Sequence, residues 1–408
     1  MTTETRTLTL EQVVPAPPDA VYRAFTNSSA LREWLADMAT TVPREGGRFY
    51  VAWNDGFYAA GSFTKLQPGK GIAFTWQGRE QPAPVTVRVT LAPEGEAGTH
   101  VLLRVEGLGE GEAWDVTAAV TAKGWRDSLE NLASVMATGE DLRFTRRPML
   151  GILVGEFNEK LASELGVPVT TGIRLDSVLE GMGAAAAGLQ PGDVLVAVNG
   201  ADVSDWPSLV TALSAHRAGD TVEVIYYRGP EKQSTAMTLS GRPIPQLPAT
   251  LKELADAARE RFRQIEVELD SFFEGVGDSA ALFKPGPDEW SAAEVLAHIL
   301  QGERYRHYWL AELAGGHEGW HDDWGGNVHA QVAATVRAYP TVNALLDELK
   351  RHHLETVAFI EQMPAEFADR RGSFWRLAYE LLDTPQHHRD HLEQMRAAIE
   401  QAPAAEPA

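Results

Sequence analysis

The sequence predicts a multidomain α+β chain that ends in an all-α four-helix bundle, and three observations predict it. The 408 residues exceed the roughly 100 to 200 residues of an ordinary domain, which suggests about three domains. Over residues 1–242, short runs alternate apolar and polar residues between Gly and Pro clusters, which is the pattern of half-buried strands. After residue 250, apolar residues recur at helical spacing in segments of about twenty residues.

The composition restricts the classes of function. The 44% of hydrophobic and 23% of charged residues are the balance of a globular chain that can bury real cores. A net charge of −21 without a stripe of Lys or Arg argues against binding to nucleic acid or to an anionic membrane surface. The chain has no cysteine, which excludes disulfides, thiolate metal ligands and a Cys nucleophile. No window approaches the roughly 18 apolar residues of a membrane span, and the N-terminus lacks a secretory signal, so we expect a cytoplasmic location.

Residues 1–142 predict a strand, a helix over residues 19–35, an antiparallel meander and a long closing helix over residues 120–138. The words VPAPPDAVYRAFTNSSALREWL (14–35) and GWRDSLENLASVMATGEDL (124–142) resemble the START-like helix-grip (SRPBCC) family, in the branch related to the activator of the Hsp90 ATPase. That resemblance implies a hydrophobic cavity between the sheet and the long helix.

The resemblance thus implies a small apolar ligand for this domain. Its cavity would be lined by Trp53, Phe63, Phe74, Trp76, Trp125 and Leu129. The alternative is that these side chains only fill the core, because buried aromatic residues are ordinary core material. The segment carries no acid/base pair and no cluster with metal-ligand spacing, so we expect it to act by binding.

Residues 143–242 contain glycine-punctuated strand patterns. The words AGLQPGDVLVAVNG (187–200) and YYRG (226–229) resemble a β-barrel-like PDZ domain of the bacterial protease-associated type. Such a domain pairs an extended peptide with an edge strand and binds its C-terminal carboxylate at a glycine-containing turn. The peptide site would comprise Met149, Leu150, Gly151 and Ile152 at the turn, with Leu209 and Leu213 on the opposing helix. The alternative is a groove occupied by a neighbouring domain of the same chain.

A proline-rich linker at residues 243–249 precedes the helical region of residues 250–399, and we expect residues 400–408 to be a disordered tail. Four helices are predicted, over residues 251–273, 291–313, 341–363 and 373–398. Ser291 and Glu294 form a capping-box pattern at the start of the second.

His387 and His391 are four residues apart, which places both imidazoles on one face of a helix. The words HHRDHLEQM (387–395) and WSAAEVLAHILQGERY (290–305) resemble the DinB family of four-helix metalloproteins, which includes thiol-dependent S-transferases. The resemblance implies a divalent metal, with zinc, nickel or iron as candidates, bound by His298, His387 and His391. Three imidazoles would leave an open coordination position. His388 lies about 100° round the helix from His387 and should not share the ion. The alternative is a solvated, His-rich helix end.

Two classes of function remain open. The first is an enzyme, a metal-dependent transferase or hydrolase in which water or a low-molecular-weight thiol attacks a small electrophile. Glu303 and the acidic residues of the loop at 315–339 are candidate bases. His317, His321 and Asp322 of that loop could contribute to the substrate pocket, and the alternative is a surface loop whose tryptophans pack on the bundle. His352 and His353 are expected at the surface, with the alternative that one of them faces the cavity behind the metal ligands. The second class is a non-catalytic scaffold or sensor that binds a small apolar ligand and protein C-termini, as a bacterial stress or signalling adaptor would. The sequence leaves the oligomeric state open.

Overall fold

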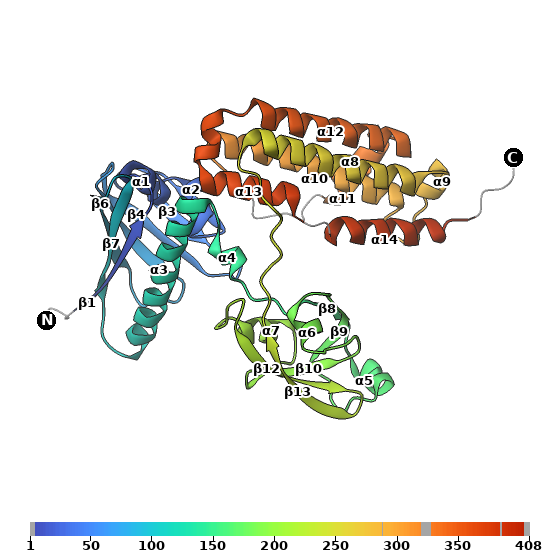
Figure 1. Cartoon of the computed structure of the whole chain (residues 1–408), viewed down its shortest axis with the longest axis horizontal. Coiled ribbons are helices and arrows are strands. Elements are labelled where there is room, and N and C mark those ends of the chain that lie inside the picture. The colour runs from blue at the N-terminus through green and yellow to red at the C-terminus, as the bar shows by residue number, and fades with distance from the viewer. Residues whose placement is uncertain (1–4, 288, 320–327, 384–385, 404–408) are drawn as a thin grey trace. The chain divides into compact units, whose positions relative to one another are not determined.

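The computed structural model describes residues 5–287, 289–319, 328–383 and 386–403. The chain folds into two compact units, one formed by Met1–Glu140 with Pro245–Ala408 and the other by Asp141–Ile244 (Figure 1). The first unit combines an N-terminal sheet domain with a helical bundle, and the second is a smaller sheet domain. The multidomain α+β class is therefore confirmed. In the described part of the chain, no helix is both long enough and apolar enough to cross a membrane.

The N-terminal domain is a seven-stranded antiparallel sheet with helices packed against it. The strand order is β1-β7-β6-β5-β4-β3-β2. Period-two alternation decides the buried face, as in β6, where Val85, Val87, Val89 and Leu91 are buried and the intervening residues are not. The strands are β1 Arg6–Val14, β2 Met38–Thr41, β3 Arg48–Ala52, β4 Tyr58–Gln67, β5 Gly71–Gly78, β6 Val85–Glu94 and β7 Gly98–Leu108. The helices are α1 Pro18–Thr26, α2 Ser28–Trp34 and α3 Glu112–Thr138.

Two predicted helix bounds in this domain are wrong. The helix predicted over residues 19–35 is broken at Asn27, whose extended backbone ends α1 and whose side chain caps α2 by accepting from the Ala30 N–H. The closing helix α3 begins at Glu112, eight residues before the predicted start at residue 120. Glu112 and Asp115 lie in its first turn, where negative charge is favoured by the helix dipole.

The second unit is a six-stranded antiparallel sheet with four short helices. Its strand order is β13-β12-β10-β9-β8, with β11 paired to β10. Arg228 makes a two-pronged ion pair with the buried Asp193, which joins the end of β12 to the turn before β10. The strands are β8 Ile152–Gly155, β9 Ile173–Val178, β10 Val194–Val198, β11 Ala201–Asp202, β12 Thr221–Arg228 and β13 Glu231–Thr238. The helices are α4 Leu142–Thr145, α5 Glu159–Leu165, α6 Gly183–Ala186 and α7 Trp206–Leu213.

The bundle is built from long helices that run alongside one another (Figure 1). They are α8 Leu251–Phe273, α10 Ala292–Gly315, α12 Val342–Gln362, α13 Arg371–Leu382 and α14 Gln386–Glu400. Shorter segments join them, namely α9 Asp278–Ala281, α11 Val328–Ala338 and the 3-10 helix Ala365–Asp369. Capping boxes start α8 at Thr250 and α10 at Ser291, as predicted for Ser291.

The structure corrects two predictions for this region. The fourth predicted helix, residues 373–398, is two helices, because α13 ends at Leu382 and Asp383 has an extended ψ of 149°. The sequence has a proline at position 385, three residues after the end of α13, and a proline beyond the last turn is a common helix stop signal. The loop predicted over residues 315–339 contains the helix α11.

Within the first unit, a buried polar cluster joins α10 and α13 of the bundle to α2 of the sheet domain. The Glu318 carboxylate, just after α10, accepts two hydrogen bonds of 2.8 Å from Arg376 and lies 3.3 Å from Arg32. The Ser373 hydroxyl donates to the buried Glu33 carboxyl at 2.5 Å, and burial raises the pKa of that carboxyl. Polar side chains in this cluster are therefore paired where they leave water.

Candidate metal centre

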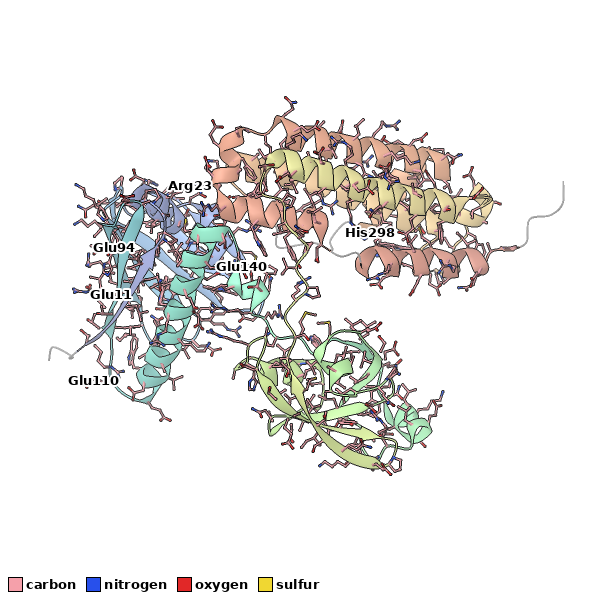
Figure 2. All side chains as sticks on the ribbon, in the orientation of Figure 1. Glu11, Arg23, Glu94, Glu110, Glu140 and His298 are labelled. Carbon is pink, nitrogen blue, oxygen red and sulfur yellow. The ribbon has the colours of Figure 1, made fainter. Side chains whose placement is uncertain are left out.

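The structure brings two of the three predicted metal ligands together. His298 lies on α10, where Figure 2 labels it, and His391 lies on α14. Their ring centroids are 5.0 Å apart, with the planes at 74°. His387 also lies in α14, but its side chain is outside the described residues. The predicted pair from two helices therefore meets at one point of the bundle.

Apolar packing fixes this approach of α14 to α10. Leu392 and Met395 of α14 are buried in the same apolar cluster as Leu296 and Leu300 of α10. Because residues three and four apart share a helix face, packing through Leu392 and Met395 holds the neighbouring His391 close to α10.

The donor set fits a divalent metal. A histidine nitrogen lies roughly 2.0–2.1 Å from a bound zinc ion, so rings whose centres are 5.0 Å apart can contact one ion between them. The Nδ1 atom of His391 lies 3.2 Å from Oε1 of Gln394, a polar contact that can orient the ring. Neutral imidazoles are ligands for zinc, nickel and iron alike, so the set does not choose among them.

A pocket of about 390 Å³ opens beside these two histidines. Two residues that line the pocket also contact the histidines. The Trp290 ring lies 5.1 Å from the ring of His298, and Gln394 contacts His391. The Trp290 indole N–H donates to Nδ1 of His329, a residue of α11, at 3.3 Å. The pocket is lined by Pro285, Glu289, Trp290, His329, Gln394, Ala397, Ala398 and Gln401.

His388, next to the predicted ligand His387, lies against α8. Its Nε2 atom is 3.1 Å from the Glu268 carboxylate. Burial lowers the pKa of His388, while Glu268 acts in the opposite direction. The contact agrees with the expectation that His388 belongs to a different face of the helix.

A layer of buried polar side chains crosses the middle of the bundle. His353 stacks on Phe262, and its Nδ1 atom lies 2.8 Å from Glu266 of α8. On the neighbouring α10, the buried Glu303 carboxylate pairs with Arg306, and it lies 3.9 Å from Nε2 of His353.

This polar layer separates two apolar clusters along each helix. On α10, Leu300 belongs to one cluster and Leu310 to the other, with Glu303 and Arg306 between them in the sequence. His353 is 3% exposed, so its predicted surface position is wrong. Glu303, the candidate base, belongs to this layer and is not among the residues that line the pocket beside His298.

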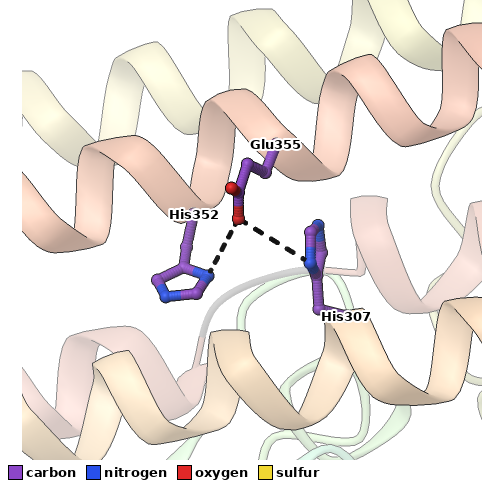
Figure 3. A group of neighbouring side chains, drawn as sticks. All are labelled: His307, His352 and Glu355. Carbon is purple, nitrogen blue, oxygen red and sulfur yellow. Dashed lines mark ion pairs between the residues drawn. The ribbon is translucent and has the colours of Figure 1, made fainter.

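A second group of metal-type ligands lies between α10 and α12, and the sequence reasoning missed it. It consists of His307, His352 and Glu355, from which one ligand atom each lie within 4.8 Å of one another (Figure 3). Burial, and next the positive charge of Arg304, lower the pKa of His352. The signal in the sequence was the i, i+3 spacing of His352 and Glu355, but their partner is 45 residues earlier.

Of the loop candidates, the structure describes His317, which belongs to neither group. His317 is exposed and its backbone N–H bonds to the Glu312 carbonyl. His321 and Asp322 lie outside the described residues.

The predicted peptide site of the second unit combines an edge strand with a left-handed glycine. Met149 pairs with Ser240 in an isolated bridge, and Gly151 has φ +80°, which explains the glycine at this turn. Leu209 and Leu213 of α7 are buried in the same core cluster as Leu150, with Ile152 packed against that cluster. The large apolar side chains of β8 and α7 that remain exposed are Leu153, Val154, Trp206 and Val210.

The predicted lining of the START-like cavity is packed ring against ring. Phe74 and Trp76 of β5 lie 6.5 Å and 5.2 Å from Trp125 of α3. Phe63 and Leu129 are also buried, and Trp53 is half-buried, with its N–H bonded to the Leu35 carbonyl. These contacts support the core-filling alternative, and the ligand cavity stays a prediction.

The fold defines a chain of three domain types, two built on antiparallel sheets and the last an all-α helical bundle. Comparison with protein families gives the particular types. Residues 15–137 match activator of Hsp90 ATPase homolog 1-like protein, residues 148–239 match the PDZ domain and residues 261–395 match the DinB superfamily. The predicted three-domain identity is thereby confirmed.

Individual relatives cover only parts of the chain. The serine protease Do-like HtrA of Lactococcus lactis subsp. lactis is 37% identical over 99 residues, 23% of this chain and 24% of the relative. The zinc metalloprotease RasP of Shouchella clausii is 39% identical over 80 residues, 19% of each chain. The chain thus spans about a quarter or less of the length of these relatives.

Solved structures match about a third of the chain. A Mesorhizobium loti protein is 24% identical, with 32% of this chain and 97% of that chain covered and a TM-score of 0.29. An HSP90 activator from Plasmodium falciparum is 20% identical, with 32% and 96% covered and a TM-score of 0.29.

Proposed function

We propose that the C-terminal bundle is a metal-dependent transferase or hydrolase that binds one divalent ion through His298, His387 and His391. The observation that carries this proposal is the 5.0 Å approach of the His298 and His391 rings beside a pocket. The match of residues 261–395 to the DinB superfamily supports it.

The chemistry follows from the ligand set. A bound divalent ion lowers the pKa of a coordinated water or thiol, which supplies a nucleophile near neutral pH. Because the chain has no cysteine, a thiol nucleophile must be a low-molecular-weight thiol from solution. Gln394 orients His391, and Trp290 covers the His298 ring while forming one wall of the pocket.

Two groups of the pocket can exchange protons with a substrate, Glu289 and His329. The Trp290 N–H donates to Nδ1 of His329, which leaves the proton of the neutral imidazole on Nε2. His329 would therefore offer a donor at Nε2 to a leaving group bound in the pocket.

Metal analysis of the full-length chain tests the proposal. The variant His298→Ala/His387→Ala/His391→Ala should hold one ion fewer per chain than the wild type. His388→Ala is the matched control, because it removes an imidazole of the same helix that contacts Glu268, and it should keep the wild-type content. Equal metal content in the triple variant and the wild type would remove the enzyme proposal.

Turnover assays then decide between the two nucleophiles. Model electrophiles are incubated with the metal-loaded chain, with and without added thiols. Turnover that requires a thiol assigns an S-transferase, turnover in its absence assigns a hydrolase, and either must be lost in the triple variant.

A non-catalytic scaffold or sensor is the second candidate, favoured by the edge strand β8. In the described sheet β8 pairs with β9 on one side only, next to the left-handed Gly151, which suits addition of a peptide strand. The first domain would bind a small apolar ligand between β5 and α3. Fluorescence polarisation with the full chain should show binding of labelled peptides with a free C-terminus and not of their C-terminal amides. Equal binding of both, or of neither, argues against the peptide receptor.

A further inference from the structure

We propose that His307, His352 and Glu355 form a second divalent-metal site, on the side of α10 that faces α12. It takes an ion of the zinc type and holds the two helices together. The inference stands on these residues alone and does not depend on the function proposed for His298.

The geometry brings one carboxylate oxygen between two imidazoles. Oε2 of Glu355 lies 3.7 Å from Nδ1 of His352 and 3.9 Å from Nδ1 of His307 (Figure 3). Two ligand atoms on one tetrahedral zinc ion are separated by roughly 3.4 Å, given bonds of about 2.0–2.2 Å. The two distances to Glu355 are therefore within about half an ångström of a coordination sphere, and one ligand atom from each of the three residues lies within 4.8 Å of the others.

A second observation points to a missing partner at the same place. Nδ1 of His352 and Nε2 of His307 are buried, and neither has a hydrogen-bond partner among the described residues. Buried polar atoms are nearly always satisfied, because an unpaired one loses its water without compensation. An ion on Nδ1 of His352 supplies that atom with a partner.

The opposite nitrogen of His352 is already backed by a carboxylate. Nε2 lies 3.5 Å from Oε1 of Glu348, one turn earlier on α12. A metal-bound histidine commonly donates its other N–H to a carboxylate, which fixes the tautomer and the ring orientation. Arg304 Nε–H donates to Nε2 of His352 at 3.4 Å, and Arg304 also pairs with Glu348 at 3.3 Å. Coordination at Nδ1 would place the ring proton on Nε2, so the contact with Arg304 would then give way to donation from Nε2–H to Glu348.

The ligand types select the class of metal. Two imidazoles and one carboxylate suit zinc and ferrous iron, whereas calcium and magnesium prefer sites made of oxygen ligands. The Glu355 side chain is 63% exposed, so water can complete the coordination.

This ion would be distinct from the one at His298. His298 and His307 are nine residues apart on α10, which corresponds to about 900° of rotation and so to nearly opposite faces. Their separation along the helix axis is about 13.5 Å, too far for one ion to reach both.

Zinc binding by the full-length chain tests the site. In the His298→Ala/His387→Ala/His391→Ala background, equilibrium dialysis should still show one zinc ion per chain. Adding Glu355→Gln should weaken that binding at least tenfold. Asp347→Asn, which removes another exposed carboxylate of α12, is the matched control and should leave it unchanged.

Two results overturn the proposal: no bound zinc in the background chain, or equal affinity in the Glu355→Gln and Asp347→Asn chains. Glu355 is exposed, so its substitution keeps the test valid even if His307→Ala/His352→Ala fails to fold. Cobalt(II) provides a spectroscopic check, because the visible absorption of a four-coordinate ion should appear in the background chain and be lost with Glu355→Gln.

Discussion

The two faces of α10 present different chemistry to their neighbouring helices. Toward α14, His298 meets His391 beside the Trp290 ring and a pocket. Toward α12, His307 meets His352 and an exposed carboxylate, Glu355. The first set consists of neutral imidazoles, whereas the second contains a negative charge.

That difference assigns the two faces different roles. An ion held by imidazoles alone would keep its full charge, which favours ionisation of a water or thiol. An ion held partly by Glu355 would be partly neutralised, and it would join α10 to α12. We therefore expect substitutions at the first face to affect turnover and those at the second to affect stability.

The largest expected effect is on turnover, which should depend on the face of α10 toward α14 and not on the face toward α12. Loss of a group that only orients a metal ligand costs roughly 10–100-fold, so loss of the ligands themselves in His298→Ala/His391→Ala should reduce kcat/KM by more than about 100-fold. His307→Ala/His352→Ala should keep turnover within a few-fold of the wild type, measured as initial rates on metal-loaded protein. The comparison fails if the second variant loses as much activity as the first.

The next largest expected effect is on the stability of the bundle, through the polar layer between the two apolar clusters. Arg306→Met leaves Glu303 buried without its partner, and breaking a buried pair costs about 3 kcal/mol or more of the free energy of unfolding. Arg263→Met breaks an exposed pair with Glu260, which water and salt screen, and should shift the unfolding midpoint far less. Urea unfolding measures both, and equal midpoints would show that the layer does not stabilise the bundle.

Acid stability should depend on Glu318, away from both faces. Burial acts to raise the pKa of Glu318, but Arg376 and Arg32 outweigh it and hold the pKa at about 2, against an ordinary value of 4.5. A depressed carboxyl pKa stabilises the fold above the unfolded value, so this contribution is present above pH 4.5 and is lost as pH falls toward 2.

The size of this contribution is at most about 3.5 kcal/mol, from roughly 1.4 kcal/mol per pKa unit. Glu318→Gln should therefore lower stability at pH 7 and flatten the fall in stability between pH 4.5 and 2. Glu106→Gln, at an exposed pair with Arg88, is the control. Parallel pH profiles for the wild type and Glu318→Gln would contradict the assignment.

The smallest expected effect is on zinc affinity at the face of α10 toward α12. Glu348→Gln removes the carboxylate behind His352 and should weaken zinc binding there by about tenfold, the lower end of second-shell effects. Turnover should not change. Isothermal titration in the His298→Ala/His387→Ala/His391→Ala background measures the affinity, and an unchanged value would mean that Glu348 does not orient His352.

How far the sequence could predict these sites depends on where the information lies. The spacing of His387 and His391, and the words shared with a metal-binding family, are local, and they led to a pair that the structure brings together as His298 and His391. His307, His352 and Glu355 depend on the register between α10 and α12, which packing of the whole bundle sets. No residue spacing within a single helix encodes this register.

The same reasoning explains the errors in the fold. Strand alternation and helical periodicity gave the elements, because both follow from which face is buried. A proline at position 385 and the asparagine at position 27 are local signals for the break before α14 and for the helix cap. The predicted helices ran through both positions because helical periodicity was given more weight. The burial of His353 was not readable, since its partners Glu266 and Phe262 lie about ninety residues earlier in the sequence.

The central claim is that His298 and His391 share a metal ion. Anomalous X-ray diffraction from crystals of the full chain grown with zinc, recorded on both sides of the zinc absorption edge, tests it most directly. The account predicts a peak at roughly 2.0–2.1 Å from a nitrogen of each ring, and a second peak among His307, His352 and Glu355. Zinc-loaded crystals without a peak between His298 and His391 would contradict it.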